Sequence, residues 1–278
     1  MNKVETEGKG LDYERYALNR FFDRLVKTYH IRSVLEIPAK GEKAMPSIYS
    51  LGLSAAGCDV TLVNPEEKSK KAWDDLGFNA EFLYCRDLTG TGIDSSKFDL
   101  VWNFMYLARV ENDALLKEMA RLSRKYVLYI GVNRYNPGFF SHRLVHRIFG
   151  IPWNHGNINF MNLFYVSEYF KNHGLRIIKT GVVDAPPYPD SLGIRDMRLH
   201  RMNIDLNKAD WESRTINWMK TGKYPLKIKL FYLYEIFPLP FFIKLLQGHL
   251  FYVLGEKISN PKFQIPNKSQ ISKFQSLN

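Results

Sequence analysis

The chain has 278 residues, of which 45% are apolar and 24% are charged, and its formal net charge is +11. These values are typical of a globular protein with a sizeable core, and they exclude an intrinsically disordered chain. Its two cysteines, Cys58 and Cys85, are too few for a disulfide framework or a cysteine-based metal site, so we expect a reducing, cytoplasmic setting.

The N-terminal residues MNKVETEGKG are polar and charged, which does not fit a signal peptide. Apolar residues then recur at helical spacing between Asp12 and Tyr29. We therefore expect an amphipathic helix there, within an N-terminal helical segment of residues 1–30.

From residue 31 onward, short apolar segments alternate with helical patterns, which predicts βαβ units. The expected fold is α/β: a Rossmann-like, doubly wound, mostly parallel seven-stranded sheet with helices on both faces and a helical, aromatic insertion. The expected core covers residues 31–190. Its first strands are predicted at Ser33–Ile37, Asp59–Val63, Ala80–Tyr84, Phe98–Phe104 and Tyr126–Val132, and its helices at Pro46–Ala56, Glu67–Leu76 and Asp113–Ser123.

The second half is richer in aromatic residues and less regular. We expect helices at Phe139–Phe149 and Val166–His173, followed by a sixth strand at Arg176–Val183. Residues 191–256 are expected to form a basic, aromatic helical insertion or cap that ends in a last strand near 250–256. Residues 257–278 are polar and are expected to be disordered.

Polar side chains stand where four of the predicted strands end: Glu36, Asn64, Asp87 and Asn103. In a doubly wound sheet the carboxyl ends of the strands line one crevice, where ligands bind. Carboxylates, amides and the backbone amides of a helix start are the groups that a nucleoside cofactor needs.

Five segments follow one another in a specific order: VLEI with its turn, DVTLVN, RDLTG, FDLVWNFMYLARVENDALLKEMARLSRKYVLYIGVN and EYFKNHGLRIIKTGVV. Over Arg32 to Val183 the chain resembles the class I S-adenosylmethionine-dependent methyltransferases, in particular those that modify small molecules and lipids. The resemblance implies S-adenosylmethionine as the cofactor and methyl transfer to a small-molecule or lipid-like acceptor.

The resemblance also implies roles for individual residues. Glu36 and the backbone from Pro38 to Gly41 would meet the methionine end of the cofactor, and Asn64 would bind the ribose hydroxyls. The remaining implied positions are Asp87 and Leu88 beside the adenine, and Asn103 and Phe104 on the face where methyl donor and acceptor meet.

The first loop departs from the family pattern, because Pro38, Lys40 and Glu42 stand where that pattern has glycines, and Asn64 stands where it has an acid. Such a loop implies a weaker or re-routed cofactor site. A methyltransferase-fold binding or scaffold protein without catalysis is therefore the alternative. A dinucleotide-binding protein would need G-x-G-x-x-G after the first strand, which this chain lacks.

Residues after the fifth predicted strand are candidates for handling the acceptor. The preferred base is His155, in the polar and aromatic segment PWNHGN, with Tyr135 and Asn133 as further candidates. His142 and His146 are four residues apart on a predicted helix, which is typical of a surface face or of a metal pair. Because no third ligand is evident, no metal is predicted.

The apolar run from Leu226 to Gly255 is interrupted by lysines, Glu235 and two prolines, so it does not predict a membrane span. Three interpretations remain open: a cap on the sheet, a pocket for a lipid-like substrate, or a surface that contacts anionic membrane. A methyltransferase acting on RNA is less favoured, because the segment Asn103–Tyr106 lacks the prolines typical of enzymes that modify base amino groups.

Overall fold

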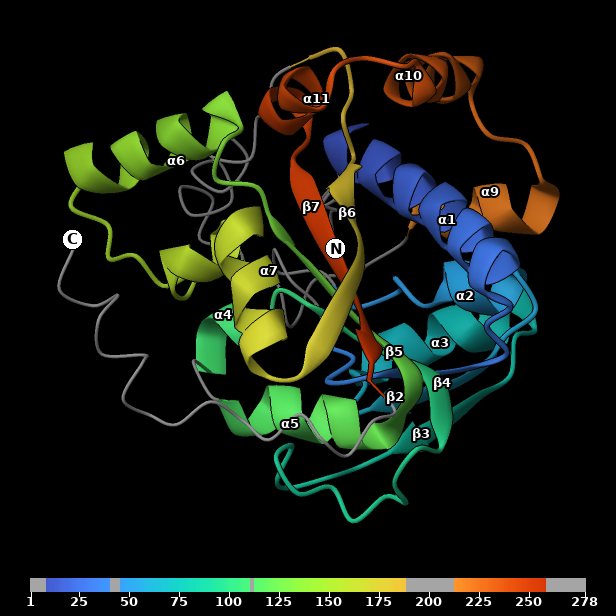
Figure 1. Ribbon diagram of the computed structural model, residues 1–278. Coiled ribbons are helices and arrows are strands. Elements are labelled where there is room, and N and C mark those ends of the chain that lie inside the picture. The colour runs from blue at the N-terminus through green and yellow to red at the C-terminus, as the bar shows by residue number, and fades with distance from the viewer. Residues whose placement is uncertain (1–8, 41–45, 111–112, 189–212, 259–278) are drawn as a thin grey trace, which may run out of the picture.

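The computed structural model describes residues 9–40, 46–110, 113–188 and 213–258. A seven-stranded sheet of order β3-β2-β1-β4-β5-β7-β6 lies at the centre (Figure 1). The strands are parallel except for β7, which runs antiparallel to both β5 and β6. The strands are β1 (Ser33–Glu36), β2 (Asp59–Val63), β3 (Ala80–Leu83), β4 (Phe98–Phe104), β5 (Ser123–Val132), β6 (Leu175–Val183) and β7 (Leu250–Lys257). The predicted mostly parallel, seven-stranded sheet is thus confirmed.

Helices cover both faces of this sheet, as expected for a doubly wound fold. One face packs against α1 (Lys9–Tyr29), α2 (Leu51–Ala55), α3 (Glu67–Leu76), α9 (Arg214–Thr221) and α10 (Leu226–Ile236). The other packs against α4 (Leu107–Val110), α5 (Asp113–Leu122), the 3₁₀ helix η1 (Ile158–Met161), α7 (Leu163–Asn172) and α11 (Phe241–Gln247). Helix α6 (Pro137–Ile148) projects beside α11.

The central strands are apolar on both sides because both sides are covered. Every residue of β4, FDLVWNF, is buried. In β5, Leu128 and Ile130 join the core beneath α1, whereas Val127 and Tyr129 join the core beneath α5 and α7. This alternation follows from the two-residue period of a strand.

The segment after β1 differs from its prediction. A helix was expected from Pro46, but α2 begins only at Leu51. The hydroxyls of Ser47 and Ser50 donate to the Glu36 carboxylate, with oxygen–oxygen distances of 2.8 and 2.6 Å. These bonds hold residues 46–50 against the end of β1 in a non-helical conformation, so the predicted start of this helix is wrong.

Residues 213–258 form α9, α10, α11 and β7. The first part of the expected insertion of residues 191–256 lies within residues 189–212, which are outside the described residues, as are residues 259–278 of the tail predicted for 257–278. Lys257, which was expected to belong to the disordered tail, is the last residue of β7. The domain boundaries stay predictions. Within the described part of the chain, no helix combines the length and the apolar character that crossing a bilayer requires.

Candidate functional site

The strand order reverses between β1 and β4, and the helices that follow these two strands, α2 and α4, pack on opposite faces of the sheet. Such a switch point is where doubly wound sheets bind ligands. Asn103, near the end of β4, is fully buried. Its side-chain amide donates to the Ile37 carbonyl at 2.5 Å, and its oxygen accepts from the Leu107 amide at 3.1 Å. Asn103 therefore ties the ends of β1 and β4 to the start of α4.

Glu36 is the last residue of β1 and is also buried. Burial raises the pKa of its carboxyl group to about 7, although the hydrogen bonds from Ser50 and Ser47 act in the opposite direction. A carboxyl group with a pKa near neutrality ionises readily when a cation binds beside it. The switch point thus holds a buried acid whose ionised form a nearby positive charge would favour.

A second carboxylate, Glu66, reaches the same segment from the start of α3. Its Oε2 accepts from the Ser47 amide at 3.0 Å, and its negative charge adds to the raised pKa of Glu36. The sequence pattern did not point to Glu66, because Asn64 was the expected ribose ligand at the end of β2. The available signal was the acidic Pro65-Glu66-Glu67 directly after that strand.

Asn64 connects the ends of β2 and β3. Its amide nitrogen donates to the Cys85 carbonyl at 2.8 Å, and its oxygen accepts from the Cys85 amide at 2.9 Å. Its φ of 54° lies in the left-handed region, which asparagine tolerates better than most residues. The structure places Asn64 at the crevice edge, and its role as a ribose ligand stays a prediction.

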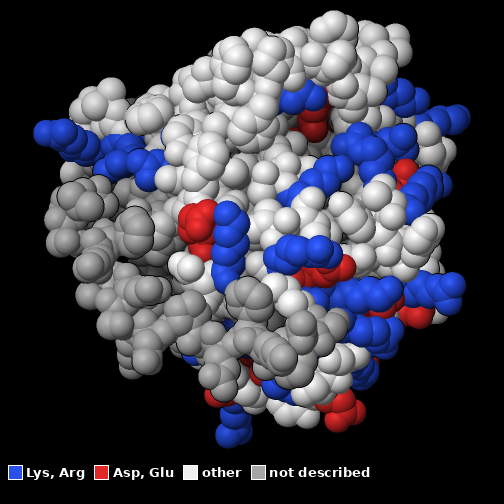
Figure 2. Space-filling model, in the orientation of Figure 1, with Lys and Arg blue, Asp and Glu red and all other residues white. Residues whose placement is uncertain are grey.

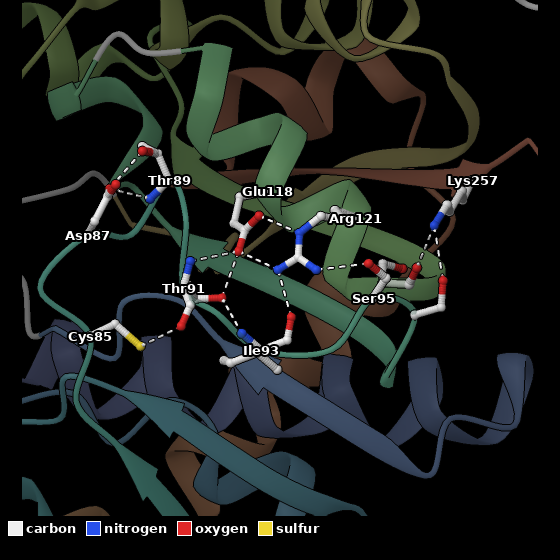
Figure 3. Close-up of polar contacts among 11 residues, drawn as sticks. Cys85, Asp87, Thr89, Thr91, Ile93, Ser95, Glu118, Arg121 and Lys257 are labelled. Atoms are coloured by element: carbon white, nitrogen blue, oxygen red, sulfur yellow. Dashed lines mark hydrogen bonds and ion pairs between the residues drawn. The ribbon is translucent and has the colours of Figure 1, made fainter.

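Asp87 lies in the loop that leaves β3. Its Oδ1 accepts from both the amide and the hydroxyl of Thr89, at 2.8 and 2.7 Å, and these bonds lower the pKa of the carboxyl group. Figure 3 shows how α5 holds this loop: Glu118 accepts from Thr91, and Arg121 binds Glu118 and the Ile93 carbonyl. The Arg121 guanidinium lowers the pKa of Glu118 to about 2, so this support is ionised at neutral pH.

The other residues expected at the cofactor lie around the same edge. Pro38 follows β1 in a turn whose next residue, Ala39, donates its amide to the Val63 carbonyl at 2.7 Å. Phe104 stacks on Tyr49, with ring centroids 4.0 Å apart. Leu88 is half-buried against the α5 side of the core. Gly41 lies outside the described residues.

Asn133 and Tyr135 follow β5. The buried Asn133 amide donates to the carbonyls of Leu245 and Gly248, and its oxygen accepts from the Tyr135 amide at 3.1 Å. The Tyr135 hydroxyl donates to Asn162 at 3.2 Å. These contacts join β5 to α11 and to the start of α7. The predicted catalytic roles of both residues stay predictions.

His155 lies with His142 and His146, so the structure supplies the third imidazole that was not evident in the sequence. The three Nε2 atoms are 3.0 to 3.1 Å from one another. Their local sequence spacing reveals only the helical pair, because His155 stands beyond the end of α6.

A cavity of about 600 Å³ opens between α1, α9, α10 and the loop after β6. Strand β6 runs in the same direction as β5, because β7 is antiparallel to both. The loop that follows β6 lines the cavity, so the cavity lies at the edge of the sheet where the parallel strands end. Its lining combines aromatic rings with two cationic side chains: Tyr13, Tyr188, Trp218 and Phe231 with Arg214 and Lys227. It has the size of a small-molecule pocket.

No family model matches the chain, and no curated protein matches it in sequence. Among solved structures, it is similar to magnesium protoporphyrin IX methyltransferase from Synechocystis PCC 6803 with bound SAH, at 12% identity and a TM-score of 0.49, over 91% of this chain and 89% of that one.

It is also similar to a geranyl diphosphate methyltransferase in complex with SAM, at 10% identity and a TM-score of 0.49, over 88% of this chain and 86% of that one. A SAM-dependent methyltransferase from Methanosarcina mazei shares 14% identity over 85% of this chain and 98% of that one, with a TM-score of 0.46. The likeness is one of fold, so a function for this chain has to come from its own residues.

Proposed function

We propose that this protein transfers a methyl group from S-adenosylmethionine to a small-molecule or lipid-like acceptor. The observation that carries the proposal is the pair of carboxylates, Glu36 and Glu66, bound to one segment at the switch point of the sheet. S-adenosylmethionine carries a sulfonium, an ammonium group and ribose hydroxyls, and two nearby acids suit these cations and hydrogen-bond donors.

The bound cofactor would supply an electrophilic methyl group, and the protein mainly has to hold donor and acceptor in line and away from water. In the proposal, Glu36 and Glu66 hold the cationic end and the ribose, and Asp87 holds the adenine amino group. Asn103 keeps the ends of β1 and β4 at a constant separation through its two backbone hydrogen bonds.

The cavity beside α1 supports an acceptor that is apolar and carries an anionic group. Aromatic rings line it, and Arg214 and Lys227 supply positive charge. Arg214 also forms an ion pair with Asp12 at 2.7 Å, which holds the guanidinium at the cavity wall. A lipid-like acceptor with an acidic head group matches this combination of surfaces.

Calorimetric titration with S-adenosylmethionine tests the proposal. We expect saturable binding by the full chain, and about tenfold weaker binding by Asp87→Ala, because one hydrogen bond to a charged group contributes about 1.5 kcal/mol. Asp94→Ala removes an exposed carboxylate from the same loop and should leave the affinity unchanged. Absence of saturation at high micromolar cofactor would refute the proposal and favour a binding protein without catalysis. Unchanged affinity of Asp87→Ala would mean that the adenine lies elsewhere.

A peripheral membrane contact is the second part of the proposal, carried by an apolar rim formed by α6, α10 and α11. Successive turns of each helix expose large apolar side chains, which are 46% to 71% exposed. In Figure 2, the upper part of the molecule, where Figure 1 places α6, α10 and α11, is largely uncharged, and Lys and Arg lie at its sides. We define the apolar rim by Leu144 and Ile148 of α6, Leu230 and Leu233 of α10, and Phe242 and Leu246 of α11.

The charges on these helices favour an anionic lipid surface as the partner. Glu235 is the only acidic residue of the three helices, and it is buried, where it accepts a hydrogen bond from Tyr13 at 2.7 Å. The cationic residues of these helices are Arg143, Arg147, Lys227, Lys229 and Lys244. Apolar side chains that insert among head groups, with cations beside them, are typical of interfacial helices.

Co-sedimentation with vesicles tests the membrane contact. We expect the protein to bind vesicles that contain phosphatidylserine, and to bind them at least about tenfold more weakly in the double variant Leu230→Glu/Phe242→Glu, because buried carboxylates oppose insertion. The control variant Tyr84→Glu changes an exposed aromatic residue directly after β3 and should bind these vesicles as the wild type does. Equal binding to neutral vesicles, or a dimer in solution that the same double variant dissociates, would contradict an anionic membrane as the partner.

A further inference from the structure

The three histidines of the α6–η1 region converge through the same ring atom. The Nε2 of His142 lies 3.0 Å from that of His146 and 3.1 Å from that of His155, and the third distance is also 3.1 Å. His142 and His146 share one face of α6 because they are four residues apart. His155 comes from the following loop and completes a nearly equilateral triangle of nitrogens.

Hydrogen bonding among the three rings cannot satisfy this triangle. In a neutral imidazole, Nε2 carries either a proton or a lone pair, so each atom either donates or accepts. With three atoms and two possible states, at least one of the three contacts joins two donors or two acceptors. A single cation that receives three lone pairs satisfies all three nitrogens at once.

The tautomer of His146 is already the one that a metal requires. Its Nδ1 lies 3.1 Å from the Ile151 carbonyl, which can only accept a hydrogen bond, so Nδ1 carries the proton and Nε2 of the neutral ring carries the lone pair. A backbone carbonyl that orients a ligating histidine in this way is the usual outer support of a metal site.

The loop that carries His155 is held in place independently of the histidines. Gly156 has a φ of +87°, and a Cβ built on it would lie 2.4 Å from the Ala108 carbonyl oxygen of α4. The Asn157 amide donates to that same carbonyl at 2.7 Å. Trp153 donates its ring N–H to the Gly156 carbonyl at 2.9 Å and lies edge-on to the three imidazoles, with centroids 4.8 to 5.8 Å away. The triangle is therefore built on fixed backbone.

We propose that His142, His146 and His155 bind one divalent transition-metal ion, Zn²⁺ in the first instance. At a metal–nitrogen distance of about 2.0–2.1 Å, the ion would sit roughly 1 Å out of the plane of the three nitrogens. Imidazole ligands suit late transition metals, and among the described residues only these three histidines form such a group. Three protein ligands leave coordination positions open, as in catalytic rather than structural zinc sites.

The proposed site lies on the α4 side of the sheet, whereas the cavity proposed for the acceptor lies beside α1, α9 and α10. The loop of the proposed site packs on α4, which starts three residues after the last residue of β4. His155 bound to a metal no longer offers a free lone pair as a base, so the metal would take over the task of lowering the pKa of an acceptor hydroxyl or a water. The metal site itself does not depend on the proposed methyl transfer.

Metal binding by tag-free protein tests the inference. After treatment with a chelator, the wild-type chain should take up one equivalent of Zn²⁺ in competition with a chromogenic chelator. His142→Ala, His146→Ala and His155→Ala should each weaken binding at least about 100-fold, since loss of outer support alone costs about 10–100-fold. Bound Co²⁺ should quench the fluorescence of Trp153, which lies against the three imidazoles. The Trp153→Phe variant should lose this Co²⁺-dependent quenching, although elemental analysis should still find bound metal.

His30→Asn is the matched control, because His30 is exposed and its φ of 53° suits asparagine. This variant should bind Zn²⁺ as tightly as the wild type. Circular dichroism checks the folding of every variant, and His155→Asn replaces His155→Ala if the latter does not fold. The inference is overturned if the wild type binds Zn²⁺ no more tightly than folded His146→Ala, or if His30→Asn loses affinity to the same extent.

Discussion

Glu36→Gln is expected to weaken S-adenosylmethionine binding by about 10- to 100-fold at pH 8, because it removes the buried negative charge at the switch point while it keeps the shape of the side chain. The affinity of the wild type should fall as the pH drops below about 7, the pKa of the Glu36 carboxyl group in the free protein. Below that pH the cation has to displace a proton, so affinity decreases by up to about tenfold per pH unit. The variant should lack this dependence.

The stability of the free protein should respond in the opposite direction. The pKa of the Glu36 carboxyl group rises from 4.5 in the unfolded chain to about 7 in the folded protein. The protonated carboxyl group therefore stabilises the folded protein fully below pH 4.5, and this stabilisation is lost as the pH rises through about 7. Glu36→Gln should therefore be at least as stable as the wild type at pH 8, as measured by thermal unfolding. Weaker binding by this variant then reports the lost charge and not a lost fold.

Glu67→Gln provides the control for this experiment. Glu67 lies beside Glu66 at the start of α3, but its side chain is 85% exposed and pairs with Lys70. Its neutralisation should leave the affinity within a factor of about two, because an exposed ion pair contributes little. If Glu36→Gln bound the cofactor as tightly as Glu67→Gln at pH 8, the cationic end of the cofactor would not lie at Glu36.

Asn103→Leu is expected to lower the free energy of unfolding by about 2–4 kcal/mol, since the Ile37 carbonyl and the Leu107 amide would both lose their buried partner. Urea denaturation monitored by circular dichroism measures this change. Cofactor affinity should fall as well, because the ends of β1 and β4 would no longer be tied together.

The same exchange at an exposed asparagine separates the lost hydrogen bonds from the effect of an added leucine. Asn172 ends α7 and is exposed, so Asn172→Leu should change the unfolding free energy by no more than about 0.5 kcal/mol. A comparably small loss for Asn103→Leu would show that β1 and β4 do not depend on the Asn103 amide.

The strands and several helices could be predicted from the sequence because their signals are local. The predicted bounds of β2, β4 and α3 agree with the structure at both ends, as continuous apolar runs and helical periodicity are readable within about ten residues. The mostly parallel, seven-stranded sheet is confirmed, and the structure adds that its strand order reverses between β1 and β4.

The start of α2 could not be predicted in this way. Residues 46–50 have no local reason to avoid a helix, but the Glu36 carboxylate binds Ser47 and Ser50 across 11 and 14 residues. Glu66 reaches the same segment across 19 residues. These contacts form only when β1 and β2 pair, so they are a product of the sheet and not of local preference.

By itself, the sequence determined the fold class and placed Glu36, Asn64 and Asn103 at strand ends and Asp87 in the loop after the third strand, because parallel strands bring their carboxyl ends to one edge. Only the tertiary structure decided that Glu66 joins Glu36, and that His155 completes a triangle with the α6 histidines. Both results depend on distances between segments that are far apart along the chain. Those distances are set by the packing of the β1–β2 end and of the His155 loop on α4, and local periodicity carries no information about them.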